Sequence, residues 1–192
     1  MEENAKKRRI FIALNLPREI KKDLAEALVK LSGEVGGVKW VKPDGLHLTL
    51  HFLGYLDEPQ IEKVMAVMDE LAKKFGSMNF EAGGIGAFPA LTNPRVFFLD
   101  CRQTNGRTVY EMQKKLGEKL SENGFTIDSR PWQAHLTLGR VKGRLSQSAF
   151  SLSRYEKIKN KNFSIDSFEL MKSKLNPDGA EYKEVISYKF PL

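Results

Sequence analysis

One tetrapeptide, His-Leu-Thr-Leu, occurs twice in this chain of 192 residues, at positions 47–50 and 135–138. Each copy follows a stretch with helical periodicity and lies in a run that alternates in the manner of a half-buried β-strand. The chain has only 3 histidines, and the two copies contain two of them. Because chance explains this poorly, the repeat predicts an internal duplication and therefore two equivalent lobes.

Side chains on a β-strand point alternately to its two faces, which determines how each copy presents its residues. His47 and Thr49 share one face, and His135 and Thr137 do the same, while the leucines occupy the opposite faces. A single half-buried histidine is more often a hydrogen-bonded structural residue. A strand that only packs a core has no need of this pair twice, so we interpret the two polar faces as one groove.

Two imidazoles and two hydroxyls suit the hydrolysis of a phosphodiester. A neutral imidazole takes a proton from the attacking water, and a protonated one gives a proton to the departing ribose oxygen. The reference pKa of histidine, about 6.5, allows both forms near neutral pH. Threonine hydroxyls donate to the non-bridging oxygens of the phosphate. We predict that this chemistry uses no metal.

The third histidine, His51, falls on the same face as His47 if the alternation is strict. The second copy has Gly139 in its place, so we expect a supporting or incidental role for His51. His47 and His51 also have the spacing of two metal ligands on a helix, but their surroundings predict a strand, and no glutamate accompanies them as in a zinc protease. We therefore expect no metal site.

The pattern along the chain predicts a mixture of helices and strands without a Pro- or Ser-rich linker, so we expect the two lobes to pack closely as one unit over residues 1–192. A lone glycine cluster, at residues 83–86, predicts a bulge or a close backbone approach. The first helix is expected to begin near Pro17 with Asn15 as a candidate cap. Strands are expected at residues 9–14, 38–41, 46–54, 79–88, 95–101 and 132–140, with two closing strands at 163–175 and 182–190, and helices at about 20–31, 59–74 and 105–123.

Composition narrows the partners and the compartment. Lysine and arginine outnumber the acids by 31 to 24, for a net charge of +7, which favours polyanions such as RNA and is explained equally well by solubility. No apolar run approaches the roughly 20 residues of a membrane span. The single cysteine, Cys101, is expected to fill the core, and it fits a reducing cytosol. We expect a cytoplasmic protein, with no membrane attachment, no obligate protein partner and a monomeric state.

Several further motifs accompany the two tetrapeptides over essentially the whole chain: Arg9-Ile10-Phe11-Ile12-Ala13-Leu14, the run from Trp40 to Gly54, Pro94-Arg95-Val96-Phe97-Phe98, His135 to Arg140, and Gly179-Ala180-Glu181-Tyr182. Together they resemble the two-histidine phosphoesterases, specifically the LigT-like RNA 2',3'-cyclic phosphodiesterases, also called 2'-5' RNA ligases. The resemblance implies a bilobal α+β fold whose two pseudo-symmetric lobes have mainly antiparallel sheets that face a central groove.

The resemblance also implies a reaction, in which an RNA end with a 2',3'-cyclic phosphate becomes a 2'-phosphate without a cofactor, and a reverse 2'-5' ligation. It implies that His47 protonates the leaving ribose oxygen, that His135 activates water, and that Thr49 and Thr137 hold the phosphate. Arg140 fits a family position that adds positive charge at the phosphate, although a surface ion pair is an equal explanation. Phe11 or Trp40 is a candidate to stack a base, against the alternative of a place in the core.

Two other functions are compatible with the same residues. The paired motifs define the chemistry and leave the substrate open, so a phosphodiesterase for 2'-5' oligoadenylate or for small cyclic nucleotide phosphates is an alternative. A non-catalytic RNA-binding module is the alternative from another class, favoured by the net charge and disfavoured by two intact acid-base motifs.

Overall fold

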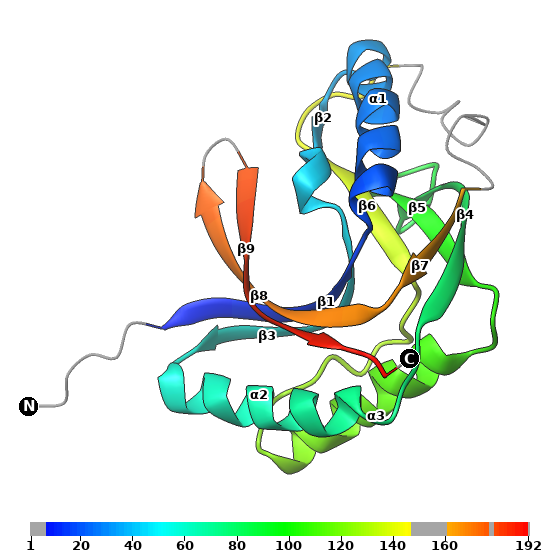
Figure 1. Cartoon of the computed structure of the whole chain (residues 1–192). Coiled ribbons are helices and arrows are strands. Elements are labelled where there is room, and N and C mark those ends of the chain that lie inside the picture. The colour runs from blue at the N-terminus through cyan, green and yellow to red at the C-terminus, as the bar shows by residue number, and fades with distance from the viewer. Residues whose placement is uncertain (1–6, 147–160, 177–178, 192) are drawn as a thin grey trace, which may run out of the picture.

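The computed structural model of the protein describes residues 7–146, 161–176 and 179–191, and within them it has the predicted mixture of helices and strands (Figure 1). The elements, in chain order, are β1 (Arg8–Asn15), α1 (Arg18–Glu34), β2 (Val38–Trp40), the 3-10 turn η1 (Pro43–Gly45), β3 (His47–Leu56), α2 (Glu58–Ala72), β4 (Met78–Phe88), β5 (Val96–Gln103), α3 (Thr108–Glu122), β6 (His135–Val141), β7 (Asn162–Ile165), β8 (Ser167–Asn176) and β9 (Gly179–Lys189).

The strands form one curled antiparallel sheet in the order β7-β4-β5-β6-β3-β1-β8-β9, and β2 pairs with β6 outside this path. The sheet has two halves, β6-β5-β4-β7 and β3-β1-β8-β9, which meet where β3 pairs with β6. A single pair of residues, Leu48 and Leu136, forms that junction. The two predicted lobes are therefore two halves of one continuous sheet, joined through the centres of the two repeated motifs.

The two halves of the chain interlace in space. Strand β4 follows the first motif in sequence but pairs with β5 in the second half-sheet, and β8, near the C-terminus, pairs with β1 in the first. The helices cross over as well: α1 lies beside β2 and η1, while α2 and α3 pack together and contact the first half-sheet (Figure 1). Neither half of the chain completes a lobe alone.

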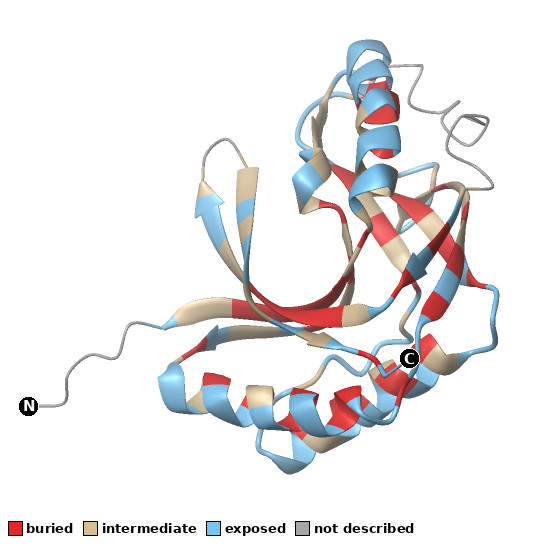
Figure 2. Ribbon diagram, viewed as in Figure 1, coloured by how far each residue is buried: buried red, intermediate tan, exposed pale blue. Residues whose placement is uncertain are grey.

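Buried residues lie along α2, α3 and one face of α1, as Figure 2 shows by colour, where these helices pack in the core. Cys101 is 2% exposed, which confirms its predicted place in the core. The glycine cluster lies in β4, whose register with β5 shifts between Ala82 and Ile85, so the predicted bulge is confirmed. No helix in the described part of the chain is long and apolar enough to cross a bilayer.

Two predictions about the helix cap and the number of strands were wrong. Asn15 does not cap α1: it is the last residue of β1, its backbone N–H donates to Glu169, and Pro17 occupies the cap position. The closing segment holds three strands and not two, because β7 pairs with β4 in one half-sheet while β8 pairs with β1 in the other. The break between β7 and β8 is where the chain passes from one half-sheet to the other.

A bulge interrupts each motif strand at the same position. Between β1 and β3 the register shifts so that Leu50 is skipped, and between β5 and β6 it shifts so that Leu138 is skipped. A bulge adds one residue to a strand and reverses the alternation beyond it. His51 and Gly139 are therefore buried, whereas the residues after them, Phe52 and Arg140, are exposed.

The bulge corrects the predicted face of His51, which does not lie on the groove face with His47. The residue is 5% exposed, and its ring packs against α3, where Nε2 donates to the carbonyl oxygen of Gln113 at 2.8 Å. A Cβ at Gly117 of that helix would lie 2.9 Å from Cε1 of His51. His51 thus has the supporting role that was expected, as a packing residue between β3 and α3.

We predict that Gly117→Ala lowers the free energy of unfolding by about 1–3 kcal/mol, because the added methyl group overpacks the site of a hydrogen-bonded ring. Gly33→Ala in α1 is the control, since a Cβ there meets no atom within 4 Å and alanine favours a helix by up to about 1 kcal/mol over glycine. Urea unfolding of both variants is the measurement. Equal stability of the two variants would contradict this account of His51.

Candidate active site

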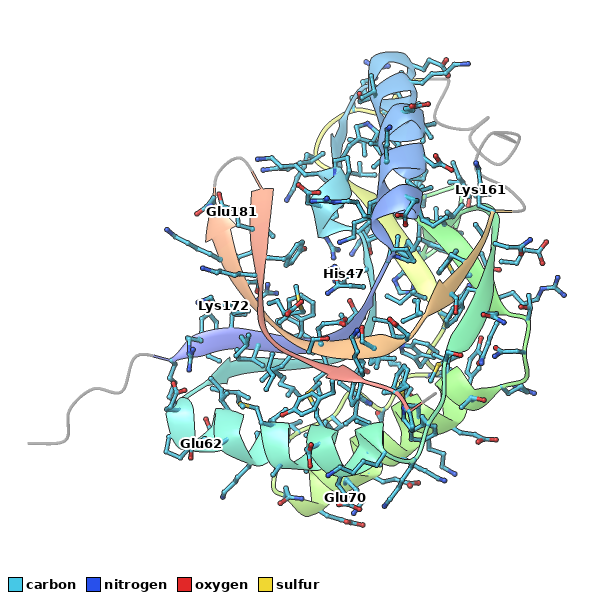
Figure 3. All side chains as sticks on the ribbon, in the orientation of Figure 1. His47, Glu62, Glu70, Lys161, Lys172 and Glu181 are labelled. Carbon is cyan, nitrogen blue, oxygen red and sulfur yellow. The ribbon has the colours of Figure 1, made fainter. Side chains whose placement is uncertain are left out.

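A groove of about 330 Å³ lies on the concave side of the sheet, where the two half-sheets meet. Figure 3 shows His47 there, between the β8–β9 hairpin and the turn below α1. Four of the five predicted site residues, His47, Thr49, Thr137 and Arg140, line it. The other lining residues are Arg9, Phe11, Val41, Gly45, Phe52, Leu175, Ala180 and Tyr182.

The register of the central pair arranges the two motifs around this groove. Because Leu48 pairs with Leu136 in an antiparallel ladder, the position of His47 faces that of Thr137, and Thr49 faces His135. The two histidines therefore occupy diagonal positions, whose Cα atoms in antiparallel sheets lie about 7–8 Å apart. Long and aromatic side chains at such positions can reach one another, so both imidazoles can approach one phosphate group.

His135, the fifth predicted residue, is not among the residues that line the cavity itself. It lies at the start of β6, opposite Asp100 of β5, and its ring is partly exposed. His135 is near enough to His47 for its charge to lower the pKa of that residue. The structure thus brings both motifs to one face, with His47 in the wall of the groove and His135 close to His47 but outside the residues that line the groove.

Each imidazole is oriented by the same backbone contact. Nδ1 of His47 lies 2.8 Å from the carbonyl oxygen of Gly45, and Nδ1 of His135 lies 2.8 Å from that of Gln133. A carbonyl oxygen only accepts, so Nδ1 carries the hydrogen in both rings. In the neutral form Nε2 is then unprotonated, and it is the atom that can take up or release a proton in each repeat.

Aromatic rings hold each imidazole from two sides. The ring of His47 lies 4.9 Å from both Phe11 and Tyr182, and the tyrosine meets it edge-on. The ring of His135 lies 5.1 Å from Phe88 and 5.4 Å from Phe98. Such packing limits the rotamers of both side chains.

A glycine makes room for one of these aromatic rings. Only glycine fits at Gly86, because a Cβ there would lie 2.5 Å from the ring of Phe98. The predicted glycine cluster therefore bears on the site, through the ring that contacts His135.

Burial sets the charge state of His47. Its ring is still reached by water from the groove, but the surrounding protein desolvates it and lowers its pKa to about 4. The hydrogen bond to Gly45 opposes this shift, and the nearby charges of Lys21 and His135 add to it. Burial therefore keeps His47 neutral at neutral pH.

The bulges place two different side chains at equivalent points of the groove. Phe52 in the first repeat corresponds to Arg140 in the second, and both line the cavity. The guanidinium of Arg9 lies 4.2 Å from the centre of the Phe52 ring and donates to Ser173 at 3.0 Å. Aligning the two repeats residue by residue identifies Phe52 from the sequence, whereas Arg9 and Tyr182 come from other strands and carry no such signal.

The two candidates for base stacking differ in position. Phe11 is 2% exposed and lies against His47, while it also contributes to the wall of the groove. Trp40 does not line the groove: it stacks on Phe97 at 6.2 Å and packs against the core. Among the described residues, no three or more His, Cys, Asp or Glu side chains cluster as metal ligands do.

Comparison with known proteins identifies the family. Residues 14–98 and 99–182 each match the LigT like Phosphoesterase family, so the match itself follows the internal duplication. The RNA 2',3'-cyclic phosphodiesterase of Thermotoga maritima is 31% identical over 188 residues, which cover 95% of both chains. That of Archaeoglobus fulgidus is 33% identical over 177 residues, which cover 92% of this chain and 97% of its own.

Solved structures agree. A protein of Thermus thermophilus superposes with a TM-score of 0.78 at 25% identity, covering 95% of this chain and 97% of its own. Escherichia coli LigT, crystallised with 3'-AMP, has the same fold, with a TM-score of 0.76 at 21% identity over 97% of this chain and 99% of its own. The chain belongs to the LigT-like phosphoesterase family and is a hydrolase homologous to the RNA 2',3'-cyclic phosphodiesterases. The resemblance of the motifs and the LigT-like α+β fold are thereby confirmed.

We predict that, without phosphate, His47 titrates with a pKa of about 4, well below that of an exposed histidine. Its ring is then mostly charged only below that pH. Nuclear magnetic resonance of the imidazole protons over pH 3–8 measures this. An anion in the groove stabilises the charged ring, so inorganic phosphate should raise the midpoint, and His135→Ala should raise it by removing a like charge. A midpoint near 6.5 in the absence of phosphate would contradict the burial argument.

Proposed function

We propose that this protein hydrolyses RNA ends that carry a 2',3'-cyclic phosphate to 2'-phosphate ends, by acid-base catalysis with His47 and His135. The observation that carries the proposal is the diagonal placement of the two histidines about the Leu48–Leu136 pair, with a threonine opposite each. The substrates named for the relatives from Thermotoga maritima and Archaeoglobus fulgidus support the same choice.

In the proposed reaction one proton moves on each side of the phosphorus: the base takes one up and the acid gives one away. A water oxygen attacks phosphorus, and its proton passes to Nε2 of the imidazole that acts as base. The bond from phosphorus to O3' breaks, and O3' takes the proton from Nε2 of the other, protonated imidazole. The products are a 2'-phosphomonoester and a 3'-hydroxyl group. The same sequence, with a 5'-hydroxyl in place of water, gives the 2'-5' ligation that the family resemblance implies.

The hydroxyls of Thr49 and Thr137 donate to the two non-bridging oxygens, where negative charge increases in the transition state. Arg140 lies on the same wall of the groove and adds a fixed positive charge toward that group. These three residues hold the phosphate, and they leave both Nε2 atoms to the proton transfers.

The direction of catalysis follows the resemblance, with His47 as the acid and His135 as the base. Because burial keeps His47 neutral near pH 7, His47 has to gain the proton that it donates when the substrate binds. The negative charge of the phosphodiester raises the pKa of a nearby imidazole, and the buried position of His47 strengthens that interaction. Substrate binding near neutral pH is therefore expected to be coupled to proton uptake.

We predict that His47→Ala and His135→Ala each lower the rate on an RNA oligonucleotide with a 2',3'-cyclic phosphate end by about 10²–10⁴. Opening of the cyclic phosphate to the 2'-phosphate is followed with EDTA present, and circular dichroism checks that each variant is folded. The same assay includes 2'-5' oligoadenylate as the competing substrate. Full activity of either variant, or a preference for oligoadenylate, would refute the proposal, and tight RNA binding without turnover would indicate a binding module.

A substrate with sulfur in place of the bridging O3' separates the two roles, since a thiolate leaves without a proton. The variant that lacks the acid should then recover most of its activity, and the variant that lacks the base should not. Recovery in His47→Ala supports the assigned direction, while recovery in His135→Ala reverses it.

A further inference from the structure

A second cavity, of about 470 Å³, lies at the start of α1, outside the groove. Basic side chains dominate its wall, with three cations against one carboxylate. The residues that line it are Leu16, Arg18, Lys21, Lys22, Ala25, Pro43 and Asp44. Nothing in the proposed reaction uses Arg18 or Lys22, so the cavity needs an explanation of its own.

The two cavities share a wall. Pro43 and Asp44 of the turn η1 line the second cavity, and the next residue, Gly45, lines the groove and accepts the hydrogen bond from His47. The ammonium of Lys21 donates to the carbonyl oxygen of Asp44 at 3.1 Å. A bound chain that leaves the groove over this turn arrives at the basic cavity.

The side chain of Lys21 connects the two cavities electrostatically. Its charge acts on His47 across the turn, since it contributes to the low pKa of that ring. Burial also lowers the pKa of Lys21 itself, ahead of the opposing effects of Asp44 and Glu169. Its ammonium is thus partly desolvated, and a charge in such an environment interacts with an anion more strongly than it does in bulk water.

We propose that the cavity between α1 and η1 binds the phosphodiester immediately 5' of the terminal cyclic phosphate, so that the preferred substrate is an oligonucleotide and not a mononucleotide. This inference rests on the proposed function. A cyclic phosphate occupies the 3' end of its strand, so the strand leaves the groove only in the 5' direction, with one negative charge per nucleotide. Arg18 and Lys22, one helical turn apart on α1, then act together on that charge.

The test compares three substrates that differ at one linkage: a nucleoside 2',3'-cyclic phosphate, a dinucleotide with the same end, and that dinucleotide with a neutral methylphosphonate linkage. We expect the native protein to favour the charged dinucleotide over the neutral one by about tenfold in kcat/KM. Salt should weaken that preference with a logarithmic slope of about 0.7, as for one phosphate contact on a single strand.

The variant for this test is Arg18→Gln with Lys22→Gln, and the mononucleotide serves as its internal reference. For this double variant, we expect the ratio of kcat/KM on the charged dinucleotide to kcat/KM on the neutral one to fall to about one. The charge-matched control is Lys63→Gln with Lys115→Gln. These lysines belong to α2 and α3, and both helices contact the first half-sheet and are remote from α1 (Figure 1). This control should keep the native ratio.

Two results would overturn the inference: a native protein that does not distinguish the two dinucleotides, or an Arg18 and Lys22 double variant that distinguishes them as well as the native protein does. Absence of turnover on all three substrates would instead refute the proposed function. Calorimetry would then measure the affinities for the same three compounds with 2'-phosphate ends. Tighter binding of the charged than of the neutral dinucleotide, lost in the Arg18 and Lys22 double variant, would support the phosphodiester site, and equal affinities would overturn it.

Discussion

The pairing of Leu48 with Leu136 is the constraint on which the rest of the structure depends. It is the point where β3 and β6 join the two half-sheets, and it lies at the second residue of each tetrapeptide. A shift of one residue in this register would turn every imidazole and hydroxyl of one motif away from the groove. Both leucines are fully buried, so the hydrophobic core itself holds the register that brings the motifs together.

The two repeats carry the same catalytic side chains but contribute different residues to the walls of the groove. Both imidazoles have the same Nδ1 contact two residues upstream, and both motif strands carry a bulge at the same leucine. Beyond the bulges the copies differ, because the first has the aromatic Phe52 where the second has the charged Arg140. The deeper burial of His47 separates it from His135 in environment. Two residues of the same type can therefore take opposite roles in one proton transfer.

The sequence predicted the strands before the closing segment, the polar faces of both motifs and the glycine bulge, because periodicity and repetition are local properties. It placed His51 on the wrong face, since a bulge is a property of two paired strands and cannot be seen from one. The exchange of β4 and β8 between the half-sheets, and the contact of Tyr182 with His47, join residues far apart in the chain. The basic cavity at Arg18 also depends on η1 folding back onto α1.

The most direct test is a structure of the protein with a nucleoside vanadate, which mimics the transition state at phosphorus. We predict that Nε2 of His47 and Nε2 of His135 both lie about 3 Å from oxygens of the same vanadium atom, on opposite sides of it. Two imidazoles that bind separate anions, or a vanadate held by only one of them, would contradict it.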